Sequence, residues 1–296
     1  MTGAPVREVW LAGVDGCRAG WIVACSRPTG ADVQVCVVPR FADVLARSEA
    51  PAVIAVDIPI GLPERVGYGG RAAENAVRPL LGARQSSVFS VQSRAALAAQ
   101  DYRAACGIAL ATSDPPRAVS KQLYMIAPKI REVDACLRAD PDAAARVFEV
   151  HPELAFWRLN GDIALAEPKK VKGRCYEPGL ALRRRLLIEA GIPPAAVNGT
   201  PPKGAGPDDL LDALACAAIA RRIRAGAARP FPDPPERDAF GLPMAIWAQE
   251  VLRPDYAALR LASISLRLIR HSAIWMALSA APLRKLSDTT HSTRPL

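Results

Sequence analysis

The hydrophobic pattern at the start of the chain predicts four strands and one short helix. Apolar runs at 8–15, 20–26 and 32–39 are separated by gaps of hairpin length, which predicts three antiparallel neighbours. Residues 41–50 have the apolar spacing of a short helix, and 52–59 form a continuous apolar run typical of a buried parallel strand. A right-handed helical crossover would place this last strand beside the first. We therefore expect an α/β fold built on a mixed sheet.

The rest of the chain has mainly helical periodicity. Apolar spacing predicts helices at 69–82, 93–106, 120–139 (with Pro128 as a point of kinking), 176–191 and 207–226. Before the fourth of these, the alternating stretch VFEV predicts a short strand containing Glu149, and Pro152 is typical of a helix start. The proline-rich residues 229–247 predict irregular structure, and we expect the folded body to end near Ala248.

These elements predict one domain at 1–248, with a helical insertion at about 67–143, and a basic C-terminal extension at 249–296. In the extension, Arg260, Arg267 and Arg270 fall on one side of a predicted helix. We expect this segment to be poorly ordered or to lie as one helix on the body. Contact with a membrane surface or with nucleic acid is the alternative.

Composition narrows the class of protein. Half of the 296 residues are hydrophobic, enough for a sizeable core, and the formal net charge is +9. This charge suits a polyanionic partner, although an arginine-rich composition alone produces the same value.

Seven cysteines lack the spacing of a zinc site, which favours reduced thiols. The N-terminus has no signal-peptide core, and the uncharged run 271–283 is shorter than the roughly 20 residues of a membrane span. We expect a cytoplasmic protein.

Acidic residues stand at the ends of predicted strands that are far apart in the chain. Asp15 ends the first strand, Asp57 ends the fourth, and Glu149 ends the strand that follows the helical insertion. Ligands of α/β sheets gather outside the carboxyl ends of such strands. If the first and fourth strands are neighbours, the carboxylates of Asp15 and Asp57 converge.

The helix predicted at 207–226 adds further carboxylates. Asp209 and Asp212 share one face, while Asp208 or Asp209 can cap the helix start. Converging carboxylates repel one another and favour a cation, and hard oxygen ligands favour Mg²⁺ or Mn²⁺. Two such ions can activate water and hold the leaving oxygen during phosphodiester cleavage. The pattern leaves open which of the three aspartates points inward.

Several of these residues also have ordinary structural interpretations. Asp57 precedes Ile-Pro and can cap a turn, and at least one of Asp208 and Asp209 is an ordinary N-cap. Glu149 can pair with an arginine such as Arg146. The run Arg183-Arg184-Arg185 indicates a solvated helix face.

Seven short motifs follow one another in the order of a known family: GVDGCRAGWIVA, VDIPIGLP, LGARQSSVF, SKQLYMIAPKIREVD, FEVHPELAF, Lys169-Lys170…Gly173 and DDLLDALA. Over about residues 8–248 the chain resembles the predicted RNase H-like nuclease family, a domain-of-unknown-function group. The resemblance implies an RNase H-like five-stranded mixed sheet, with three antiparallel strands followed by parallel ones, flanked by helices. It also implies a metal-dependent nuclease, an activity inferred mostly from fold.

The resemblance implies a role for each acid. Asp15 is the central acid of the first strand, Asp57 that of the fourth, Asp212 (or Asp209 one turn earlier) that of the late helix, and Glu149 that of the next strand. Catalysis then rests on Asp15, Asp57, Glu149 and Asp212, and metal binding on Asp15, Asp57, Asp209 and Asp212. The first-helix glutamate of RNase H has no counterpart here, because Glu49 stands at the wrong end of 41–50. A resolvase-like arrangement fits better.

Polar and basic residues complete the predicted site. Hydroxyls and cations in loops can hold phosphate, Gln122 and Lys129 share a helix face, and His151 points the same way as Glu149 on a strand and can protonate a leaving group. A hydrogen-bonded structural role is the alternative for His151. The substrate contacts that we expect are Arg84, Ser86, Ser87, Gln122, Lys129, His151, Lys169 and Lys170.

Three functions follow from these residues. The first is metal-dependent hydrolysis of nucleic-acid phosphodiesters with bound Mg²⁺ or Mn²⁺. The second is a domain of the same fold that binds nucleic acid or a protein without cutting. The third is an actin-like phosphotransferase, but the chain lacks the second Asp-Gly strand turn and the late glycine-rich loop that this class needs. The oligomeric state stays open, a dimer included.

Overall fold

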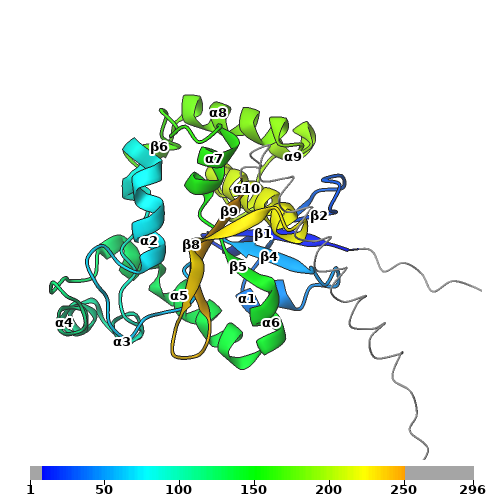
Figure 1. The fold of residues 1–296 in the computed structure, drawn as a ribbon. Coiled ribbons are helices and arrows are strands. Elements are labelled where there is room, and N and C mark those ends of the chain that lie inside the picture. Colours follow the sequence, from blue (N-terminus) through cyan, green and yellow to red (C-terminus); the bar gives the residue numbers. More distant parts are fainter. Residues whose placement is uncertain (1–8, 251–296) are drawn as a thin grey trace, which may run out of the picture. The chain divides into compact units, whose positions relative to one another are not determined.

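The computed structural model describes residues 9–250, and its centre is a five-stranded mixed sheet (Figure 1). Its strand order is β3-β2-β1-β4-β5, in which β1 pairs antiparallel with β2 and parallel with β4. Antiparallel β2–β3 and parallel β4–β5 pairs complete the sheet. The predicted strand order is therefore confirmed. The strands are β1 (Leu11–Cys17), β2 (Gly20–Ser26), β3 (Gln34–Val38), β4 (Val53–Val56) and β5 (Val147–Glu149).

Because side chains alternate between the two faces of a strand, the acids at the strand ends lie on one side of the sheet. Leu11 of β1 and Ala55 of β4 pack on the same hydrophobic cluster as the helix α10 (Pro207–Arg224). Asp15 follows Leu11 by four residues and Asp57 follows Ala55 by two, so both continue the α10 side. The opposite face packs against α1 (Phe41–Leu45) and α5 (Lys121–Ala139).

Close contact between β1 and α10 depends on a glycine. A Cβ placed on Gly13 would lie 2.0 Å from the backbone nitrogen of Ala217 and 2.1 Å from the carbonyl oxygen of Ala213. Only a residue without a side chain permits this approach of helix to strand. The contact places the start of α10, including Asp212, near the end of β1.

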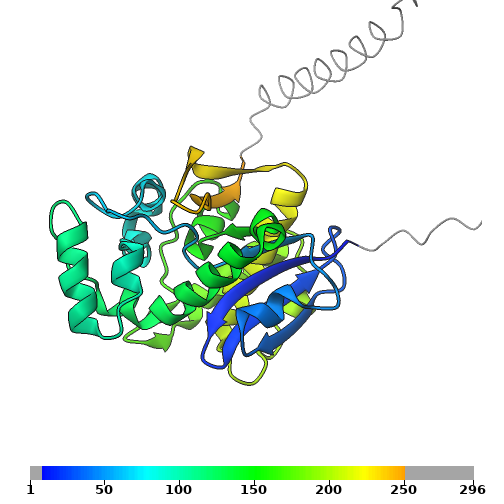
Figure 2. The same ribbon diagram turned by 90° about the horizontal axis from the view of Figure 1, so that it is seen from below.

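The predicted insertion is helical, but its first two helices are divided. Residues 69–82 form α2 (Ala72–Val77) and then the 3₁₀ helix η1 (Arg78–Ser87), which kinks at Gly82. Residues 93–106 are split because Ser93 and Asp101 each cap a new helix start. Figure 2 shows these latter helices beside the sheet rather than over it. The insertion elements that follow η1 are α3 (Arg94–Leu97), α4 (Tyr102–Thr112), α5 and α6 (Pro141–Arg146).

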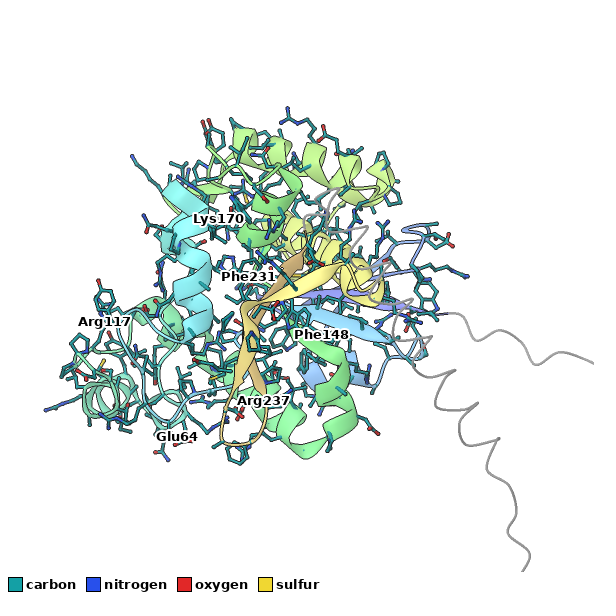
Figure 3. All side chains as sticks on the ribbon, in the orientation of Figure 1. Glu64, Arg117, Phe148, Lys170, Phe231 and Arg237 are labelled. Carbon is teal, nitrogen blue, oxygen red and sulfur yellow. The ribbon has the colours of Figure 1, made fainter. Side chains whose placement is uncertain are left out.

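The prediction of irregular structure for 229–247 was wrong. This stretch forms an antiparallel hairpin of β8 (Ala228–Arg237) and β9 (Pro243–Gln249). A two-stranded ribbon tolerates proline because each strand has a free edge, and a register shift between Phe231 and Glu236 accommodates the proline cluster. Phe231 and Ile246 pack against α2 and α7 (Pro152–Leu159), and Trp247 meets the ring of Phe148 edge to face. Figure 3 labels Phe148 and Phe231.

Shorter elements connect the late helices. They are β6 (Lys170–Val171), β7 (Arg174–Cys175), α8 (Glu177–Glu189) and α9 (Pro194–Val197). No helix within residues 9–250 is long and apolar enough to cross a membrane. The expectations for the C-terminal extension, its arginine-bearing helix included, concern residues from 251 onward and lie outside the described range.

Candidate functional site

A cavity of about 430 Å³ opens at the carboxyl ends of β1, β4 and β5. Asp15, Asp57 and Glu149 line it from the three strand ends, and His151 follows from the turn into α7. This is the edge at which α/β sheets bind ligands. The insertion and the β8–β9 hairpin form the facing walls, because η1, α5 and Ile246 also line the cavity.

Asp15 and Asp57 lie side by side. Val14 pairs with Val56 in the parallel register, and the backbone N–H of Asp57 donates to the carbonyl oxygen of Val14 at 2.9 Å. Burial raises the pKa of Asp15 well above its usual range, and the charges of Asp57 and Asp212 raise it further. Burial raises the pKa of Asp57 to about 6, with Asp212 adding to the rise and His151 opposing it. These carboxylates repel one another.

Asp212 of α10 belongs to the same cluster of acids, and it forms an ion pair with Lys169. Its Oδ2 accepts a hydrogen bond from Nζ of Lys169, whereas its buried Oδ1 has no hydrogen-bond partner among residues 9–250. Burial raises the pKa of Asp212, and Lys169 opposes this rise. Burial alone would lower the pKa of Lys169, but Asp212 and Asp15 raise it. Lys169 is therefore the cation that balances this cluster.

The other two aspartates of α10 have local partners. Oδ2 of Asp209 accepts from the backbone N–H of Gly206 at 2.8 Å, which caps the helix. Asp208 pairs with Lys170 at 2.5 Å. Of the three candidates that the sequence left open, Asp212 raises the pKa of Asp15 the most. Asp209 and Asp212, both predicted as metal ligands, are not among the residues that line the cavity, although Asp212 bonds to Lys169, which does line it.

Glu149 lines the cavity but is bound on both oxygens. Arg71 of the insertion donates to Oε1 at 2.6 Å and to Oε2 at 3.0 Å, and the backbone N–H of Ile60 donates to Oε2 at 2.7 Å. Arg71 also binds Glu74, so one buried arginine joins two carboxylates. The predicted alternative partner, Arg146, instead donates to the carbonyl oxygens of Pro51 and Leu45. Glu149 thus anchors the insertion to the sheet edge.

All eight residues predicted to contact substrate line this one cavity, although they come from four separate segments. Lys129 lies 4.4 Å from the ring centroid of Trp21 and donates to the carbonyl oxygen of Gly20. Nε2 of His151 lies 3.3 Å from the carbonyl oxygen of Ser87, and its buried Nδ1 has no hydrogen-bond partner within residues 9–250. Figure 3 labels Lys170, which lines the cavity beside Lys169.

Comparison with protein families identifies the chain over this same region. A family model described as "Protein of unknown function (DUF429)" matches residues 13–237, which include every acid discussed above. The chain belongs to this family. No curated protein matches it, and no solved structure does.

In this DUF429 protein a buried ion pair joins Glu153, which lines the cavity, to Arg183, and the sequence analysis did not predict this pair. Arg183 is fully buried and donates to Glu153 Oε1 and Oε2 at 2.6 and 2.8 Å. It also donates to the carbonyl oxygen of Glu167 at 3.0 Å, in the loop that leads to Lys169. The expectation of a solvated face was therefore wrong for Arg183. The adjacent Arg184 does pair at the surface, with Glu177.

The donor set of the DUF429 cavity fits a divalent cation in chemical type. Asp15 and Asp57 line the cavity with hard oxygens, and Asp212, outside the lining, has a buried Oδ1 without a partner in the described part of the chain. Within that part, however, no three or more His, Cys, Asp and Glu side chains are already grouped as a metal site. The ammonium group of Lys169 bonds to Asp212, where a metal ion would have to compete for the same carboxylate.

Proposed function

We propose that this DUF429 protein is a metal-dependent phosphodiester hydrolase with an RNase H-type core that acts on nucleic acid. The observation that carries the proposal is the convergence of Asp15, Asp57 and Asp212 from three distant segments, where burial raises the pKa of each carboxyl and neighbouring acids raise those of Asp15 and Asp57 further. A fold keeps such repulsion at a sheet edge when a cationic ligand relieves it. The basic residues on the cavity wall suit an anionic substrate.

Asp15, Asp57 and Asp212 would hold Mg²⁺ or Mn²⁺. Bound there, the cation supplies charge stabilisation for a phosphoryl group and acidifies water. The chain's own residues supply the remaining functions. Arg84 and Lys170, both on the cavity wall, orient phosphate oxygens. His151 lies beside Asp57, and its free Nδ1 can hold a proton for the leaving oxygen.

Hydrolysis is tested with the full chain on single-stranded, duplex, hybrid and branched DNA and RNA, with Mg²⁺ or Mn²⁺ and with a chelator. We expect metal-dependent cleavage that Asp15→Asn reduces by at least about 100-fold. Asp142→Asn is the matched control, because Asp142 is exposed on α6, away from the cavity. Circular dichroism verifies that both variants fold. Cleavage that persists in Asp15→Asn, or none on any substrate, contradicts the proposal.

A binding domain without hydrolysis is the second candidate, and Lys169 favours it. Its ammonium group already balances Asp212, so the cluster is partly neutralised by the chain itself. Titration with Mn²⁺ in a calorimeter separates the two functions. A hydrolase binds the ion at the cluster and loses that binding in Asp15→Asn, whereas a domain that relies on Lys169 shows no such binding.

A further inference from the structure

The insertion turns the open edge of the sheet into a pocket. The cavity is lined from the sheet by Asp15 and Asp57, from η1 by the residues around Ser86, and from α5 by the face that carries Ile126. The Arg71–Glu149 ion pair holds the start of the insertion against β5. A ligand that reaches the carboxylates therefore has protein on several sides rather than on one.

The walls of this pocket are of two chemical kinds. Apolar side chains from three segments contribute to the lining: Ile58, Phe89, Val91 and Ile126. Phe89 and Ile126 are only half-buried, so part of each side chain stays open to a ligand. Beside them lie hydroxyl and amide groups of Ser86, Ser87 and Gln122. An aromatic ring next to hydrogen-bonding side chains is the surface on which nucleobases stack and bind.

The lining also contains charged groups. They are the acids of the strand ends and the cations Arg84, Lys129, Lys169 and Lys170. Arg84 lines the cavity, and its buried Nε has no hydrogen-bond partner among the described residues. A guanidinium is a preferred partner of phosphate oxygens. The lining therefore offers groups that suit a phosphate together with groups that suit a planar ring.

The size of the cavity distinguishes among ligands that contain both a planar ring and a phosphate. A volume of about 430 Å³ lies within the range of roughly 300–1,000 Å³ that small-molecule pockets occupy. Proteins that bind duplex DNA instead bury about 1,000–2,500 Å² over an open surface. We propose that the pocket accepts one nucleotide unit, base and phosphate together, either as a free nucleotide or as the unpaired end of a strand. This inference rests on the proposed function and names its substrate class.

Binding is measured with the full chain by calorimetry in Mg²⁺, with thymidine 5′-monophosphate as the probe. Competitors are a short linear single strand, the same strand closed into a circle, and a covalently closed duplex. We expect the mononucleotide to bind and the closed duplex to compete poorly. Competition by the linear strand but not by the circle assigns the site to strand ends. Competition by neither assigns it to free nucleotides, and strong competition by the closed duplex overturns the inference.

Phe89→Ala tests the stacking wall, with Phe240→Ala as the matched control. Phe240 is 50% exposed in the β8–β9 turn and does not line the cavity. We expect Phe89→Ala to weaken mononucleotide binding by at least about tenfold, because base stacking on an aromatic ring is lost. Phe240→Ala should leave it unchanged. If Phe89→Ala does not fold, Ile126→Ala tests the same wall. Equal affinities of the wall variant and the control overturn the inference.

Hydrolysis of the 4-nitrophenyl phosphodiester of thymidine 5′-monophosphate separates this inference from the proposed function. Metal-dependent release of nitrophenol supports both the single-nucleotide pocket and the hydrolase. Internal cleavage of a closed duplex, without inhibition by the mononucleotide, retains the hydrolase and overturns the single-nucleotide pocket. Mononucleotide binding that Phe89→Ala weakens, without cleavage of any substrate, retains the pocket and overturns the hydrolase.

Discussion

Lys169 and Asp212 form a hydrogen-bonded ion pair in which the aspartate is almost completely buried and the lysine only partly so. Lys169 directly precedes β6, and Asp212 lies in α10, 43 positions later in the chain. The pair lies near enough to shift the pKa values of Asp15 and Asp57, which Asp212 raises and Lys169 lowers. Within the described residues, Lys169 thus supplies a bonded cation to a cluster of three carboxylates.

Lys169→Met should therefore leave the cluster without a cation. In chelator near neutral pH, we expect the free energy of unfolding to fall by roughly 2–3 kcal/mol, less than for a fully buried pair because Lys169 is 27% exposed. Mg²⁺ should raise the melting temperature of this variant more than that of the wild type. Lys203→Met, at an exposed loop position, is the control. Equal stability of the two variants in chelator would show that Lys169 does not balance the acids.

Asp57→Asn should change the pH dependence of stability. The pKa of Asp57 is raised to about 6 in the fold, from about 3.9 in the unfolded chain. Folding therefore favours the protonated form, and this contribution is complete below about pH 4 and is lost as pH rises through about 6. The free energy of unfolding of the variant should exceed that of the wild type by about 3 kcal/mol near pH 7.5 and match it near pH 4.

Urea unfolding in chelator, repeated across this pH range, measures the difference. Asp142→Asn, at an exposed position of α6, is the control variant. A stability difference for Asp57→Asn that grows as pH falls would have the opposite sign and would contradict the raised pKa.

Arg183→Met should be strongly destabilising. The variant leaves Glu153 charged in the interior without its partner, for which a loss of about 3–5 kcal/mol is expected. Arg184→Met, one residue along, removes a surface pair and should change stability by less than about 1 kcal/mol. Denaturant midpoints of the two variants provide the comparison. Similar midpoints would mean that Arg183 is not held in the interior.

Gly13→Ala should separate β1 from α10. Its Cβ would overlap backbone atoms of Ala213 and Ala217, so we expect a loss of about 3 kcal/mol or more. Gly107→Ala in α4, where no atom lies within 4 Å of the added Cβ, should gain about 0.5–1 kcal/mol. Thermal unfolding of both variants tests this. A neutral effect of Gly13→Ala would show that the helix does not approach the strand so closely.

Local sequence patterns predicted the sheet well and the turns less well. The apolar run at 52–59 and the hairpin-sized gaps before it led to the observed strand order, because burial periodicity and loop length are local properties. The β8–β9 hairpin was missed because its prolines argue against a strand unless both edges are known to be free. The helix predicted at 93–106 is interrupted because Asp101 caps a new helix start, and helical periodicity alone did not show this cap.

Within the candidate site, the sequence predicted which strand-end acids and substrate contacts line the cavity, but not that Asp209 and Asp212 stay outside its lining. Asp15 and Asp57 terminate apolar strands, and strand ends converge when their strands pair. Only the tertiary structure decided which charge balances which: Lys169 with Asp212, Arg71 with Glu149, and Arg183 with Glu153. These partners are 30 to 78 positions apart. Periodicity reports the face on which a residue lies, whereas ion pairing depends on the distance between atoms that the completed fold brings together.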